Sequence, residues 1–282
     1  MLLGPGIVAC VALVAVLATL DPADCRPALP QGPGVTLDET FNIQMGAFFT
    51  EAARTYGVGL LSPVSLHEVF STPGYNPDHP PLARLWLGIF HDLVQWMAPP
   101  ANVANGPAGP LATVTVSARA GSAVAFALTV FLVGGFTARG HGSFAGTAAA
   151  ASLVMMPRVF GHAHLAALET VTGLFWTASI LVTAHLWSRR SFPSDRVAAF
   201  TGLLIGLTFL CKMQAVLLPP LLTVWAFWNW RLFAFRPLVI AGLMTGVVFI
   251  VGWPWLWLDF PKHFVDYFSS ATNRTELHCW YL

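Results

Sequence analysis

The stretch PLVIAGLMTGVVFIVGWPWLW, Pro237 to Trp257, contains no charged side chain. A helix needs roughly 20 mostly apolar residues to cross a bilayer, so this stretch predicts a membrane-spanning helix. Other apolar ranges predict further spans: Leu2–Leu20, Ala118–Thr137, Ser143–Met156, Thr170–Trp187, Ala198–Leu210 and Ala215–Trp230. Together they predict an all-α polytopic membrane protein with about seven spans.

The first of these ranges has two interpretations. Small residues at Ala18 and Ala23 resemble the cleavage region of a signal peptide. No basic residue precedes the apolar run, however, whereas signal peptides carry a basic n-region. The favoured interpretation is a retained helix.

The composition limits the function classes. Hydrophobic residues make up 56% of the chain and charged residues 10%, and 14 basic residues against 13 acidic ones give a net charge of +1. A protein without a strongly basic face has no surface suited to nucleic acid. We therefore expect membrane lipid, and no nucleic acid, as a partner.

Charged residues are distributed unevenly between the predicted spans. Short connections carry arginines at Arg139, Arg189, Arg190, Arg196, Arg231 and Arg236. Cytoplasmic loops are enriched in Lys and Arg, so these connections are predicted to lie inside. The long segment Asp21–Ser117 and most Asp, Glu and His residues then face outward. Within it, LARLWLGIFHDLVQWM (Leu82–Met97) predicts an amphipathic helix in the membrane interface, with Arg84 largely off the apolar face.

Two adjacent carboxylates, Asp38 and Glu39, are candidates for acid–base chemistry. Neighbouring side chains point to different sides of a regular element, so one would act on the substrate and the other would support it. A partly buried carboxylate is suited to accept a proton from a hydroxyl. The alternative is a pair of solvated loop acids.

Several cations and polar groups are further candidates. Lys212 is a lone lysine between apolar runs, which indicates an anion, a cavity or a partner, or else a side chain that extends to the interface. The planar guanidinium of Arg158 fits a phosphate. His79 would contact phosphate or acceptor, or stabilise a turn.

A second polar cluster contains His162, His164 and Glu169. A metal site is conceivable there, but residues two apart do not share a helix face, which disfavours it. The alternative is a set of hydrogen-bonded residues at the end of a span.

Five stretches carry a resemblance to a known family: LDETFN (37–42), DHPPLARLWLGIF (78–90), MMPRVFGHAHLAALETVTGLFW (155–176), GLLIGLTFLCKMQAVLLPPLL (202–222) and GWPWLWLDFPKHFVDYF (252–268). In this order the chain resembles GT-C superfamily membrane glycosyltransferases, in particular the dolichyl-phosphate-mannose–protein mannosyltransferase family and its bacterial relatives. The resemblance implies a GT-C-like transmembrane helix bundle over 1–282. Chains of this family continue into further spans where this sequence ends at HCWYL, so the resemblance also predicts a C-terminally incomplete domain.

The resemblance also implies a reaction. A sugar would pass from a polyprenyl-phosphate donor to a hydroxyl of a protein, lipid or glycan, by one inverting displacement on the outer face of a plasma or inner membrane, toward the periplasm or lumen. Asp38 would be the general base, with Glu39 as its alternate or support. Lys212 and Arg158 would stabilise the leaving phosphate.

The remaining candidates would line the substrate cavity: His79, Pro80, Pro81, His162, His164 and Glu169. No cofactor is implied with certainty, and a divalent cation is left open. The alternatives are a polytopic transporter, disfavoured because no internal repeat is evident, and an inactive membrane scaffold or fragment.

Overall fold

The computed structural model describes residues 1–21, 36–97, 110–187 and 192–272, and within these residues the chain is helical with no strand. The long bundle helices are α1 (Leu3–Ala18), α5 (Pro110–His141), α6 (Ser143–Val154), α8 (Leu168–Leu186), α9 (Asp195–Phe209), α10 (Leu218–Trp230) and α11 (Phe235–Gly252). The others are α2 (Leu37–Tyr56), α3 (Pro63–Phe70), α4 (Pro81–Met97), α7 (Pro157–His162) and α12 (Phe260–Thr272), together with short 3₁₀ turns.

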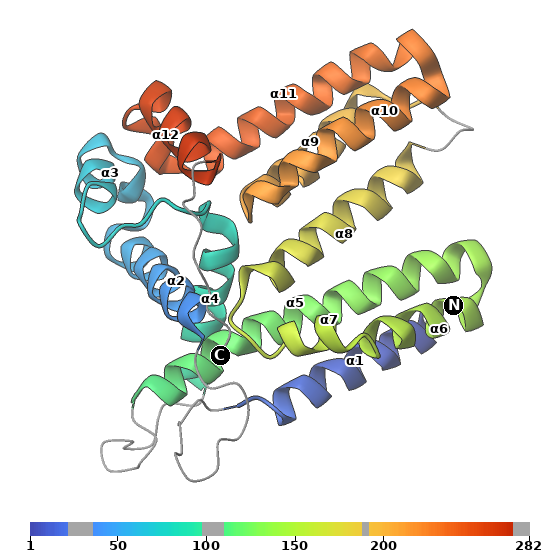
Figure 1. Ribbon diagram of the computed structural model, residues 1–282, viewed down its shortest axis with the longest axis horizontal. Coiled ribbons are helices and arrows are strands. Elements are labelled where there is room, and N and C mark those ends of the chain that lie inside the picture. Colours follow the sequence, from blue (N-terminus) through green and yellow to red (C-terminus); the bar gives the residue numbers. More distant parts are fainter. Residues whose placement is uncertain (22–35, 98–109, 188–191, 273–282) are drawn as a thin grey trace.

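The bundle helices run side by side, and α2, α3, α4 and α12 cover one end of them (Figure 1). Helix α5 packs against α1 and α6, while α9 packs against α11. Glycine makes the second contact close, because a Cβ on Gly202 would lie 2.2 Å from the carbonyl oxygen of Ala241. Small residues at such crossings let two backbones approach, which is how helices associate in lipid.

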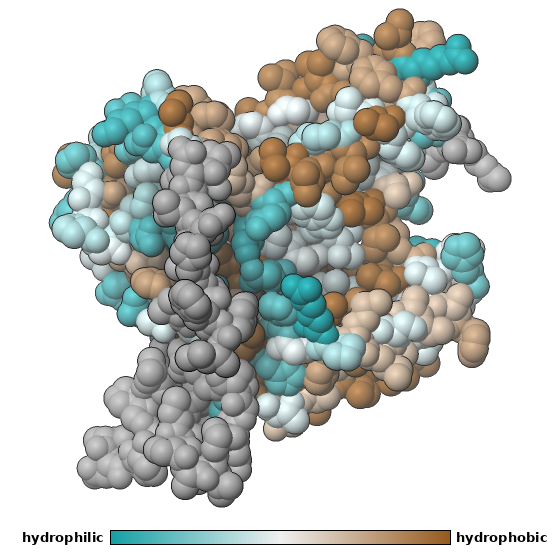
Figure 2. Space-filling view, in the orientation of Figure 1, coloured by the Kyte–Doolittle hydropathy of each residue, from teal (hydrophilic) through white to brown (hydrophobic). Residues whose placement is uncertain are grey.

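Large apolar side chains are exposed along one stripe of several bundle helices. The stripes recur every three or four residues and comprise Ile7, Val11 and Val14 on α1, Leu221, Val224 and Trp228 on α10, and Leu243, Val247 and Val251 on α11. Hydrophobic residues gather over α10 and α11 in Figure 2, and hydrophilic ones over α3. A helix face of this kind is typical of helices that contact lipid or another protein.

A helix forms at each of the seven predicted ranges, and the number that cross a membrane stays a prediction. Two stretches of the described residues are long and apolar enough to span a membrane, Thr115–His141 and Met213–Gly252. The second is divided between α10 and α11 by a turn at Arg231, whose backbone φ is 53°. The all-helical prediction is confirmed for the described residues.

The segment predicted as one outer loop, 21–117, is more structured than expected. It contains α2, α3 and α4, and its last residues already belong to α5. Each of these three helices has a local start signal: Thr36 donates its amide to the Glu39 side chain at 2.9 Å, Ser62 caps α3, and Pro81 is the first residue of α4. Proline suits that position because the first helical amides have no partner within the helix.

Helices α2 and α4 touch at their backbones. A Cβ on Gly88 would lie 2.3 Å from the carbonyl oxygen of Gly46, so no side chain fits between them. This contact turns α4 so that Arg84 is only 1% exposed, whereas Ile89 and Met97 are 49% and 61% exposed. Arg84 lies off the face that carries Ile89 and Met97, as predicted, but its side of the helix is the buried one, because the guanidinium has polar partners there.

Candidate active site

A small polar pocket lies where the covered end of the bundle meets the cap helices. Its walls come from the first turns of α2 and α8, the turn before α4, and the turn after α9. The lining residues are Asp38, Phe41, Asn42, Asp78, His79, Arg84, Leu168, Glu169 and Lys212. Four of the candidates predicted from the sequence therefore meet in one pocket: Asp38, His79, Glu169 and Lys212.

Asp38 lies in the first turn of α2 and is exposed to the pocket. Its carboxylate has no hydrogen-bond or ion-pair partner among the described residues. Successive helix positions differ by about 100°, so the next residue, Glu39, points elsewhere. The two carboxylates therefore have different surroundings, as the sequence predicted for adjacent positions.

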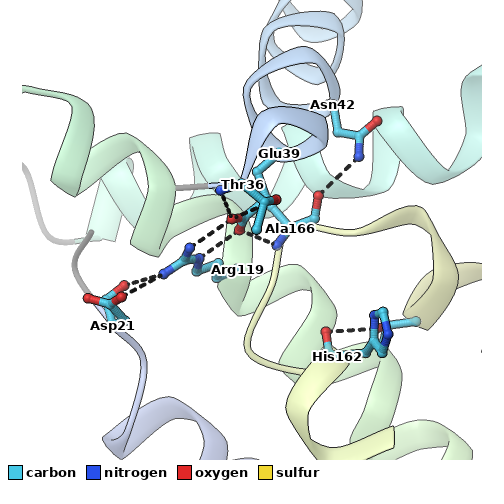
Figure 3. A network of polar contacts seen from close by, with 8 residues as sticks. Asp21, Thr36, Glu39, Asn42, Arg119, His162 and Ala166 are labelled. Carbon is cyan, nitrogen blue, oxygen red and sulfur yellow. Dashed lines mark hydrogen bonds and ion pairs between the residues drawn. The ribbon is translucent and has the colours of Figure 1, made fainter. Parts of the chain in front are cut away.

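Glu39 is fully buried and forms a two-pronged ion pair with Arg119 of α5 (Figure 3). Arg119 Nε donates to Glu39 Oε1 at 2.7 Å, and Nη2 donates to Oε2 at 2.8 Å. The backbone amides of Thr36 and Ala166 donate to the same carboxylate at 2.9 and 2.8 Å. Arg119 also donates to the backbone oxygen of Asp21 at the end of α1.

The Glu39 carboxylate is charged at neutral pH. Burial by itself would raise its pKa, but the hydrogen bonds from Arg119 and from two backbone amides outweigh burial and hold the pKa below its ordinary value. A buried charge with this many donors is a fixed structural element.

A second set of polar contacts continues from α2 to the pocket. Asn42 Nδ2 donates to the carbonyl oxygen of Ala166 at 3.3 Å, and Arg84 Nε donates to Asn42 Oδ1 at 3.5 Å. Arg84 also forms an ion pair with Asp78 at 2.7 Å, between Nη1 and Oδ1, and donates to the carbonyl oxygen of Asn76 at 3.1 Å. These contacts hold the turn before α4 against α2.

Lys212 and Glu169 form an ion pair at the mouth of the pocket. Lys212 belongs to the turn between α9 and the 3₁₀ segment Met213–Leu217, and Glu169 to the first turn of α8. The lysine side chain is 16% exposed and the glutamate side chain 50%. An amide hydrogen bond from Leu82 to the carbonyl oxygen of Leu210, 2.9 Å long, ties the start of α4 to this turn.

The remaining predicted candidates lie outside this pocket. Arg158, His162 and His164 line a different pocket, between α7 and the end of α1. His164 hydrogen-bonds Thr19 at 2.8 Å and the carbonyl oxygen of Phe160 at 2.9 Å. The structure therefore does not bring Arg158 to Lys212. His162 lines this other pocket but stays near Glu169, because its carbonyl oxygen accepts a hydrogen bond from the hydroxyl of Thr170 at 3.0 Å.

Pro80 and Pro81 are buried beneath the turn that carries His79. They shape the backbone where α4 begins and are not among the residues that line the pocket.

Arg119 was not among the residues predicted to be functional, although it lies inside the predicted span Ala118–Thr137. An arginine at membrane depth is costly and normally has a carboxylate partner, so this was an available signal. Glu39 was predicted as a candidate residue, but its ion pair with Arg119 was not, because the two residues lie 80 positions apart in the chain.

Comparison with known families gives one match. The family model described as dolichyl-phosphate-mannose-protein mannosyltransferase matches residues 112–257, just over half of the chain. The matched region includes Arg119, Glu169 and Lys212 but not Asp38. No curated protein and no solved structure matches the chain.

Proposed function

Because the chain belongs to the dolichyl-phosphate-mannose-protein mannosyltransferase family, we propose that it is a membrane glycosyltransferase that uses a polyprenyl-phosphate sugar as donor and a hydroxyl group as acceptor. The observation that carries the proposal is the pocket in which Asp38, an exposed carboxylate, shares walls with the cation Lys212. These are the two charges that such a transfer requires.

Asp38 acts as the general base. The acceptor hydroxyl loses its proton to the carboxylate while its oxygen attacks the anomeric carbon. The bond from that carbon to the phosphate oxygen breaks, and the electron pair leaves with the lipid phosphate. A single displacement of this kind inverts the anomeric centre. A positioned base contributes typically 10²- to 10⁴-fold to the rate.

Lys212 stabilises the phosphate as it leaves. Negative charge grows on the phosphate oxygens in the transition state, so a cation held beside them lowers the barrier. Lys212 suits this role because its side chain is largely buried and its backbone amide is bonded to the carbonyl oxygen of Thr208 at 3.3 Å. Glu39 supports Asp38 indirectly, because its ion pair with Arg119 fixes the first turn of α2.

The polyprenyl chain lies in an apolar groove formed by α8, α9 and α10. The groove is lined by Ser179, Ile180, Thr183, Ala184, Ile205, Leu218, Leu221, Leu222 and Trp225. Its residue Leu218 begins α10, only a few residues after Lys212, so a donor with its phosphate at the lysine can place its chain in the groove.

The pocket faces outward, toward a periplasm or lumen. This orientation is supported by Arg139, Arg231 and Arg236, which lie near the helix ends away from the pocket, as cytoplasmic arginines would.

The test is transfer of radiolabelled sugar from a polyprenyl phosphate in membranes that contain the chain. Asp38→Asn should lower the initial rate by about 10²- to 10⁴-fold, because an amide does not accept the proton. The matched control is Glu51→Gln, an exposed acid on α2 that does not line the pocket.

Equal rates of sugar transfer for Asp38→Asn and the wild-type chain would show that Asp38 is not the general base. Absence of transfer by an inserted, folded wild-type chain would contradict the transferase proposal, and solute flux in vesicles would then test the transporter alternative.

A further inference from the structure

We propose that Glu169 is the residue that releases the spent lipid phosphate, by competing with it for Lys212. The inference rests on the proposed function and extends it to a step after sugar transfer. The Glu169 carboxylate pairs with Lys212 in the structure, and after transfer it displaces the polyprenyl monophosphate from the lysine.

The first support is the set of charges that line the pocket. Asp78 is paired with the buried Arg84, so that among the described residues lining the pocket Lys212 is the lysine or arginine that faces both Glu169 and the incoming donor. A phosphate that binds Lys212 therefore competes with a carboxylate already there for the charge of the lysine. The same replacement runs in reverse when the product leaves.

The second support is the unequal anchoring of the two partners. Lys212 is held in a tight turn with its side chain 16% exposed, whereas the Glu169 side chain is 50% exposed and can turn aside. Glu169 also lies in the first turn of α8, where the helix dipole stabilises a carboxylate without any lysine. The pair can open at a small cost.

The third support is the change of charge during the reaction. The donor is a phosphodiester with one negative charge, whereas the product is a monoester whose second ionisation has a pKa near 6. The product therefore binds Lys212 more strongly than the donor does. A carboxylate held beside the lysine offsets this difference and prevents the product from blocking the pocket.

The experiment measures product inhibition of the full chain in membranes, with the polyprenyl monophosphate as inhibitor. Glu169→Gln should lower the inhibition constant about fivefold, the factor that corresponds to an exposed ion pair of about 1 kcal/mol. The KM for the donor should fall in the same direction, and kcat should not rise. Glu169→Asp keeps the charge but shortens its reach, so it should fall between the two proteins.

Glu51→Gln is again the matched control and should leave the inhibition constant unchanged. A parallel assay measures binding of radiolabelled polyprenyl monophosphate without turnover. If the wild-type chain transfers sugar but Glu169→Gln binds the monophosphate equally or more weakly, the inference fails and the proposed function stands. If the wild-type chain neither transfers sugar nor binds the monophosphate, both fail.

Discussion

Two ion pairs beside the first turn of α2 and the first turn of α8 differ in almost every respect except their chemistry. In the pair Glu39–Arg119 the side chains are 1% and 0% exposed, and the carboxylate accepts further bonds from Thr36 and Ala166. In the pair Glu169–Lys212 the exposed fractions are 50% and 16%. The first pair is a buried structural contact, a fixed joint that connects α2 to α5, whereas the second pair lies where a ligand can reach it.

The difference shows that the role of an ion pair depends on how far its side chains are exposed. A buried pair cannot exchange partners, because each charge would be left without a donor or acceptor in an apolar medium. A half-exposed pair can exchange them, because water and an incoming phosphate both compete for the lysine. Stability should therefore depend on the first pair and turnover on the second.

The largest change in stability is expected for Arg119→Ala. The substitution leaves the Glu39 carboxylate buried without its cation, which costs about 3–5 kcal/mol. The free energy of unfolding, measured in detergent by circular dichroism, should fall by this amount. Arg139→Ala, an exposed arginine on the same helix, is the control and should change little.

If Arg119→Ala unfolds at the same denaturant concentration as the wild-type chain, the description of this pair as a fixed joint is wrong. The double variant Glu39→Gln with Arg119→Ala should recover part of the loss, because it removes the unpaired charge.

A smaller change in stability is expected for Gly88→Ala, which tests the close contact between α2 and α4. This contact holds the two helices that contribute the first turn of α2 and the start of α4. Its added methyl group would lie 2.3 Å from the carbonyl oxygen of Gly46, and backbone atoms cannot move aside cheaply. Such overpacking costs about 1–3 kcal/mol of unfolding free energy.

Gly59→Ala is the matched control for this crossing, since a Cβ there would meet nothing within 4 Å. Equal losses for the two variants would show that the close contact of α2 and α4 does not contribute to stability.

The smallest change in stability is expected for Lys212→Ala, which breaks the partly exposed pair with Glu169. Its unfolding free energy should change by about 0–1 kcal/mol, because a partly exposed ion pair contributes little. Sugar transfer should nevertheless fall by about 10²- to 10³-fold, the typical effect of removing one group that stabilises transition-state charge. A loss of stability as large as that of Arg119→Ala would make the two pairs equivalent and contradict the comparison.

The sequence predicted the positions of the helices better than the contacts between them. Apolar runs such as Pro237–Trp257 identify helices because hydropathy is a local property. Asp38, Glu169 and Lys212 were chosen individually and through a family resemblance, and the structure brings them to one pocket.

Contacts between distant segments could not be predicted in the same way. Glu39 meets Ala166 across 127 positions, and no local pattern encodes that distance. Arg158 matched a phosphate site by its chemistry alone, whereas the short helix α7 carries it to a different pocket. Arg84 was expected on the polar side of an amphipathic helix, but the Gly46–Gly88 contact buries that side.

The order of residues in the two ion pairs has a consequence for biogenesis. In each pair the carboxylate precedes the cation in the chain: Glu39 comes 80 residues before Arg119, and Glu169 comes 43 residues before Lys212. A ribosome therefore completes each carboxylate before the cation that needs it. By the time α5 is synthesised, the counter-ion of its arginine has therefore already been translated.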